Sequence, residues 1–157
     1  MLDEYGDLPS ALRGGPIYAA ADVIPTTAHS WVHANGLILG RRGETGHPRY
    51  SVEDVARLLL MRVLTDRFSM AAQAAARITN NHTYHIAHWC LPTSNQRRGR
   101  IYHAGAQIMF GFSSDDPLAE AAFLEVNLDK LCTEAKRRLS LWLRPVEPLS
   151  LVENEAA

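Results

Sequence analysis

The chain has 157 residues, enough for one or two small domains with a real hydrophobic core, and its formal net charge is −1. Its two cysteines cannot make a disulfide framework, and no apolar run is long enough to span a membrane. Residues 1–15 lack the basic start and apolar centre of a signal peptide, so we expect a cytoplasmic protein without a membrane partner.

The first predicted elements are two short helices. We expect residues 1–16 to form a flexible lead, followed by a helix over residues 18–24 that Pro25 interrupts, because proline lacks an N–H. A second helix is predicted over residues 26–35, and Gly36 ends it as a C′ residue. One side of this helix is apolar, and the other carries short hydrogen-bonding groups suited to a groove: Thr27, His29, Ser30 and His33.

A glycine-rich hairpin is predicted after Gly36. Residues 37–39 read as its first strand, residues 40–46 as the turn, and residues 47–50 as the returning strand. Pro48 favours an exposed edge for that second strand, because proline cannot donate to a ladder. The result is a two-stranded wing.

Two further helices follow the wing. Ser51 is a good N-cap for an apolar helix over residues 52–64, which has two acidic residues in its first turn. Residues 68–70 read as a corner, from which Ser69 caps a helix over residues 71–78. The polar stretch at residues 79–81 is typical of a helix end, and we place a domain boundary after residue 79.

This order of elements resembles the DNA-binding domain of the MerR family of transcriptional regulators, over about residues 17–77. The most specific motifs are Arg49-Tyr50-Ser51 with Asp54-Val55-Ala56-Arg57-Leu58, and the corner Phe68-Ser69-Met70; the likeness also includes Ala21-Asp22-Val23, residues 28–31 and Gly36-Leu37-Ile38. The resemblance implies a winged helix-turn-helix over residues 17–79 that binds double-stranded DNA as a dimer, with the second helix in the major groove.

The same resemblance implies the DNA-contacting residues. It assigns them to the second helix and the wing: Thr26, Thr27, Ser30, Trp31, Arg41, Arg42, Arg49 and Tyr50. The groove side of the helix adds His29 and His33. Trp31 can either lie over the DNA backbone or pack beneath the wing, and we favour packing because a buried indole would cover Leu37 and Tyr50.

Residues 80–145 read as a C-terminal α+β domain for dimerisation or sensing, followed by a disordered acidic tail over residues 146–157. We predict a strand pair at residues 100–104 and 107–112, and a long helix over residues 118–143. The apolar stripe of that helix can be fold core or partner surface. As a dimer contact it offers Leu128, Leu131, Leu139 and Trp142.

A run of metal-ligand residue types lies at the start of this half. His82, His85, His88 and Cys90 are ligands that zinc and copper prefer. Their spacing is poor, because His88 turns away from the helix face of the first two histidines, so we expect no metal and no cofactor. Neither a nucleophile elbow nor a phosphate loop is present, and we therefore do not expect an enzyme.

The sequence thus predicts a mainly α fold with a small β component. The expected function is a nucleoid-associated, sequence-specific transcriptional regulator that acts as a homodimer on a pseudo-palindromic promoter site, with RNA polymerase as a further partner. Two alternatives stay open. One is an excisionase-like accessory factor that bends DNA, and the other is a protein-interaction module that has lost base readout.

Overall fold

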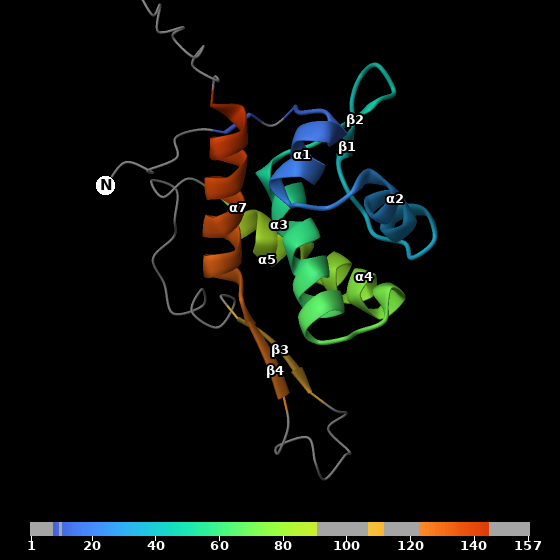
Figure 1. Cartoon of the computed structure of the whole chain (residues 1–157), viewed down its shortest axis with the longest axis vertical. Helices are drawn as coiled ribbons and strands as arrows, with labels where there is room; N and C mark the ends of the chain where they lie inside the picture. Colours follow the sequence, from blue (N-terminus) through green and yellow to red (C-terminus); the bar gives the residue numbers. More distant parts are fainter. Residues whose placement is uncertain (1–7, 10, 91–106, 112–122, 145–157) are drawn as a thin grey trace, which may run out of the picture.

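The computed structural model describes residues 8–9, 11–90, 107–111 and 123–144 (Figure 1). The described residues are mainly helical with two small antiparallel sheets, which confirms the expected fold class at that level. The elements in chain order are α1 (Gly14–Ala20), α2 (Pro25–His33), β1 (Arg41–Arg42), β2 (Pro48–Arg49), α3 (Val52–Arg62), the π-helix η1 (Val63–Arg67), α4 (Ala72–Asn81), α5 (Thr83–Trp89), β3 (Gln107–Gly111), β4 (Phe123–Asn127) and α7 (Leu128–Leu143).

Helix α3 is the centre of the core. All of its residues from 54 to 61 are buried, so the helix must be covered on several sides. Helices α1, α4, α5 and α7 supply that cover. In Figure 1, α7 stands along one side of α3, while α2 and the β1–β2 hairpin lie on the other side.

The N-terminal segment joins the fold earlier than predicted. Helix α1 begins at Gly14 and ends at Ala20, so the helix predicted over residues 18–24 lies too late in the chain. Leu12 exchanges two backbone hydrogen bonds with Tyr50, both of 2.9 Å. Residues 12–16 therefore belong to the folded unit rather than to a flexible lead.

The helices after the wing start and end close to their predicted positions, with one correction. Ser69 does not cap α4, because its backbone is left-handed, with φ at 52°, and the N-cap residue is Ala71. The π-helix η1 continues α3 as far as Arg67, and the corner at residues 68–70 then leads into α4. Helix α4 ends at Asn81, within the polar stretch that predicted its end.

The predicted long helix over residues 118–143 is wrong in its first part. Residues 123–127 form β4, which pairs antiparallel with β3, and α7 begins only at Leu128. The side-chain oxygen of Asn127 caps α7 by accepting the Lys130 backbone N–H at 3.0 Å. The partner predicted for the 107–112 strand was residues 100–104, and these lie outside the described residues, as does the predicted tail over 146–157.

Helix α7 packs against α1 and α3, so the described parts of the two predicted domains share one core. This packing corrects part of the predicted dimer contact. Leu128 and Leu139 are 0% exposed within the chain and cannot meet a partner, and Leu131 is partly buried against the same core. Of that predicted set, Trp142 is the exposed residue, at 52%.

Candidate nucleic-acid interface

Helix α2 presents one continuous polar face to solvent. Proline at its first position is tolerated because that N–H has no partner within a helix, and the buried Ala28 and Trp31 fix which side faces the core. The exposed residues then follow at intervals of three and four positions: Thr26, His29, Ser30 and His33. We call these four residues the groove face. A further predicted contact of this helix, Thr27, is half-buried.

Trp31 does not lie on the groove face. It is 7% exposed, and its backbone carbonyl accepts the Leu37 N–H at 2.9 Å. The expectation that the indole packs rather than faces outward is therefore confirmed. Because a buried ring cannot reach a nucleic acid, Trp31 leaves the set of contact candidates.

The wing, residues 40–50, is a short antiparallel hairpin beside α2. Arg41 pairs with Arg49 and Arg42 with Pro48, so the first strand lies at residues 41–42 and not at the predicted 37–39. Gly40 and Gly46 have φ of 72° and 78°, which L side chains rarely adopt, at the two ends of the turn region. Arg41 and Arg42 are exposed, whereas Arg49 and Tyr50 are half-buried at the base of the wing.

A single buried carboxylate holds both ends of the wing against α3. Asp54 accepts the N–H of Gly40, the first residue of the wing, at 2.8 Å and the N–H of Ser51, immediately after the wing, at 2.9 Å. Its charge is paired with Arg57 at 3.1 Å, and Asp54 is only 3% exposed. The sequence identified Asp54 as a first-turn acid and as part of a motif, but the structure makes it the residue that positions the hairpin.

Other polar side chains fix the segments on either side of α2. The Asn80 side chain on α4 accepts the Ile38 N–H at 3.0 Å and donates to the Gly36 carbonyl at 2.8 Å. Arg62 on α3 donates to the Ala21 carbonyl at 3.0 Å, in the turn that leads into α2. Both ends of α2 are thus tied to the helices behind it.

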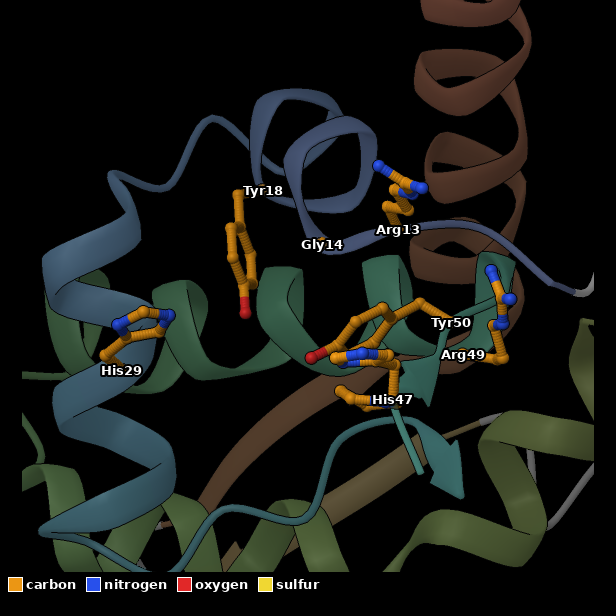
Figure 2. Close-up of a pocket in the computed structure, with 8 residues that line it drawn as sticks. Arg13, Gly14, Tyr18, His29, His47, Arg49 and Tyr50 are labelled. Carbon is orange, nitrogen blue, oxygen red and sulfur yellow. The ribbon is translucent and has the colours of Figure 1, made fainter. Parts of the chain in front are cut away.

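A pocket of about 440 Å³ lies where α1, α2 and the wing meet (Figure 2). We call it the tyrosine pocket, and it is lined by Arg13, Gly14, Tyr18, His29, His47, Pro48, Arg49 and Tyr50. Figure 2 shows the Tyr18 and Tyr50 hydroxyl ends directed toward each other, with His29 reaching in from α2. The pocket contains three of the predicted contact residues and adds three that sequence reasoning missed: Arg13, Tyr18 and His47.

The hydroxyl of Tyr50 is held in its neutral form. Burial, and then the hydrogen bond with Tyr18, raise the pKa of Tyr50 to about 12. The two rings are tilted at 60°, with centroids 6.3 Å apart. Tyr50 therefore keeps its proton at any physiological pH and donates its single O–H to the Tyr18 hydroxyl.

The predicted metal-ligand run does not converge. The His82 and His85 Nδ1 atoms are 3.4 Å apart at the start of α5, and burial with the charge of His85 lowers the pKa of His82. Cys90 is buried instead beside Cys132 of α7, and the hydrogen bond between their thiols, together with burial, raises the pKa of Cys90. Within the described residues, no group of three or more potential ligands gathers around one point.

No known protein family, curated protein or solved structure matches the chain. In the part of the chain that the structure describes, no helix is both long enough and apolar enough to cross a membrane. The choice among functions therefore depends on the geometry of α2, the wing and the tyrosine pocket.

Proposed function

We propose that the protein is a sequence-specific DNA-binding transcriptional regulator in which α2 enters the major groove and the wing lies along the phosphate backbone. The observation that carries this proposal is that α2 and the wing face the same side of the molecule. His29 of the groove face lines the same pocket as His47, Arg49 and Tyr50 of the wing. A docking helix and its neighbouring hairpin must meet one duplex together, and this arrangement satisfies that requirement.

The charges of these elements support the proposal. Helix α2 contains no acidic residue, while the wing carries three arginines, at positions 41, 42 and 49, and a single acid, Glu44. A protein of near-neutral total charge has to gather its positive residues on one face to attract DNA. Hydroxyl and imidazole groups on α2 suit base edges, and arginines on the wing suit phosphates.

The proposal includes a homodimer. A helix of nine residues and one hairpin bury little DNA surface, so two half-sites are the economical route to specificity. Since Leu128 and Leu139 are in the core, Trp142 is the exposed residue of that predicted set, and the exposed Leu141 next to it in the chain adds to the surface available for a partner. Sedimentation of the parent and of Trp142→Glu at micromolar concentration tests this part, and a parent that sediments as a monomer while binding a palindrome tightly refutes it.

Mobility-shift and footprinting assays on the promoter of the protein's own gene test the main proposal. We expect Arg41→Gln with Arg42→Gln to weaken binding to all sequences alike. The slope of log affinity against log salt should become shallower by about 2 for each bound protomer. Ser30→Ala should instead change which bases are preferred. Arg77→Gln, which removes one exposed arginine of α4, is the control for a loss of charge away from the proposed interface.

Each outcome of these assays selects one function. A wing double variant with the parent's affinity and salt slope contradicts the docking arrangement. The absence of binding at low salt favours the protein-interaction module, and binding that bends DNA without changing transcription by RNA polymerase favours the excisionase-like factor.

A further inference from the structure

We propose that the tyrosine pocket binds a free phosphorylated small molecule of about mononucleotide size. The pocket is assembled from residues at positions 13 to 50 that belong to α1 with its N-cap residue Arg13, to α2 and to the wing. Its lining offers two guanidinium groups, two imidazoles and two tyrosine side chains, and it includes no carboxylate. That composition suits an anion that also carries a flat ring.

Three of the lining side chains lie close to glycines, which have no Cβ atom that would crowd them. A Cβ atom at Gly14 would lie 3.0 Å from the Tyr18 ring, and one at Gly40 would lie 2.9 Å from the Tyr50 ring. A Cβ at Gly43 would lie 3.1 Å from Cγ of Arg49. Three side chains of the pocket thus lie directly against glycine backbone, where a larger residue would crowd them.

The hydrogen-bonding groups of the pocket favour a phosphate. The Tyr50 hydroxyl donates to that of Tyr18, which leaves the Tyr18 O–H to donate to a ligand. Arg13 and Arg49 lie on the opposite side of the tyrosines from His29 (Figure 2). Arginine binds phosphate oxygens through paired N–H donors. Tyrosine rings offer faces on which a nucleobase can stack.

Size and charge favour a free ligand over the DNA backbone. Small-molecule pockets have volumes of roughly 300–1,000 Å³, and this one, at about 440 Å³, is far larger than one backbone phosphate group needs. A backbone phosphodiester carries one negative charge and two ester substituents that keep it on the outside of the duplex. A terminal phosphate carries close to two charges and can enter.

Occupancy of the pocket would regulate DNA binding. His29, Arg49 and Tyr50 belong both to the pocket and to the proposed DNA contacts, so ligand and DNA would compete for them. This competition rests on the proposed function, whereas ligand binding itself does not. Arg13 belongs to the pocket alone and separates the two properties.

Titration calorimetry of the full chain with adenosine 5′-monophosphate, adenosine and inorganic phosphate tests the proposal. We expect adenosine monophosphate to bind at least about ten-fold more tightly than adenosine, because the phosphate supplies the charge-assisted hydrogen bonds. Arg13→Gln should weaken that binding about ten-fold while leaving DNA affinity near the parent value. Tyr50→Phe, which keeps the ring, tests the hydroxyl, and Arg77→Gln is the control that should bind like the parent.

The outcomes separate this proposal from the proposed function. Binding of adenosine monophosphate that depends on Arg13, in a protein that does not bind DNA, supports the pocket and refutes the regulator. DNA binding without any heat from adenosine monophosphate or phosphate refutes the pocket. Binding that is equal in the parent and in Arg13→Gln, or equal for adenosine and its monophosphate, also refutes it, since the phosphate would then not be recognised.

Discussion

Helix α3 is joined to α7 and to the wing in two physically different ways. Its contact with α7 is apolar, through fully buried residues such as Leu58, Leu128 and Leu139. Its contact with the wing is polar, through the hydrogen bonds of Asp54 to the backbone on either side of the hairpin. Apolar contact is strong but non-directional, while a carboxylate that bonds two N–H groups fixes a position.

Because of this difference, variants can lower the stability of the whole molecule or change the position of one segment. Removing a buried leucine should lower the free energy of unfolding of the whole molecule, because the core is shared by both halves. Removing one of the polar side chains should release a segment of the candidate interface while the core stays folded. The following variants test that division, beginning with the largest expected effect.

The first variant breaks the apolar contact. Leu139→Ala should lower the free energy of unfolding by about 2–5 kcal/mol, because it leaves a cavity in the shared core. Urea unfolding followed by circular dichroism measures the loss, and a single transition is expected. Leu141→Ala, 47% exposed on the same helix, is the control and should change stability little. Two separate transitions in Leu139→Ala would show that the halves do not share a core.

The second variant breaks the polar contact with the wing. Asp54→Asn keeps the size of the side chain but removes the charge that faces the buried Arg57, and should cost about 2–3 kcal/mol. Hydrogen exchange at the Gly40 and Ser51 amides should accelerate more than exchange in α3. Glu53→Gln, which alters weaker ion pairs at 3.7 and 3.8 Å, is the matched control. Uniform acceleration across α3 would contradict a local role for Asp54.

The third variant sharpens the comparison at the segment between α2 and the wing. Asn80→Ala removes the bonds to Gly36 and Ile38 and should cost about 1 kcal/mol, because the side chain is partly exposed to water. The Ile38 amide should then exchange faster. The loss in free energy of DNA binding should be larger than the loss in free energy of unfolding. Asn81→Ala, at the neighbouring exposed residue, is the control. Its stability, Ile38 exchange and DNA affinity should match those of the parent. If Ile38 exchange is unchanged, this bond does not hold the segment.

The smallest effect is expected at the exposed side of α7. Hydrogen bonding from Arg137, and then from Arg138, lowers the pKa of Glu134 from its usual 4.5 to about 2, although partial burial opposes the shift. A depressed folded-state pKa adds stability above the unfolded-state pKa, and this is lost as pH falls from about 4.5 to about 2. The side chain is 37% exposed, so solvent screening limits the gain to less than about 1 kcal/mol.

Glu134→Gln tests this pH dependence. The parent should be slightly more stable than the variant at pH 7, and the difference should disappear near pH 2. Thermal unfolding of both proteins across this range measures it. A difference that grows as the pH falls would have the wrong sign for an ion pair.

Local signals made the starts of α2 and α3 and the turn of the wing predictable, because Pro25, Ser51 and the turn glycines mark them, whereas Ser69 did not mark the start of α4. The failures depended on contacts between distant residues. Residues 37–39 read as a strand, but the Asn80 side chain provides the hydrogen bonds that a partner strand would have given. The β4 strand was read as helix, since its pairing with β3 is not encoded locally, although Asn127 followed by Asp129 was an available signal for the start of α7.

The groove face of α2 could be predicted, because helical periodicity separates it from the buried Ala28 and Trp31. The tyrosine pocket could not, since its lining comes from three elements whose relative placement no local pattern specifies. The role of Asp54 was hidden for a similar reason. A first-turn acid is normally explained by the helix dipole, and its bond to Gly40 appears only when the hairpin is folded back.

The position of α7 against α1 and α3 also has a consequence for synthesis. Translation proceeds from the N-terminus, at about 5–20 residues per second, so α3 emerges long before α7 exists. During that interval one apolar side of α3 has no cover from its own chain. The apolar side of α3 therefore stays open to chaperone binding or aggregation until residues 128–143 have been synthesised and can pack against it.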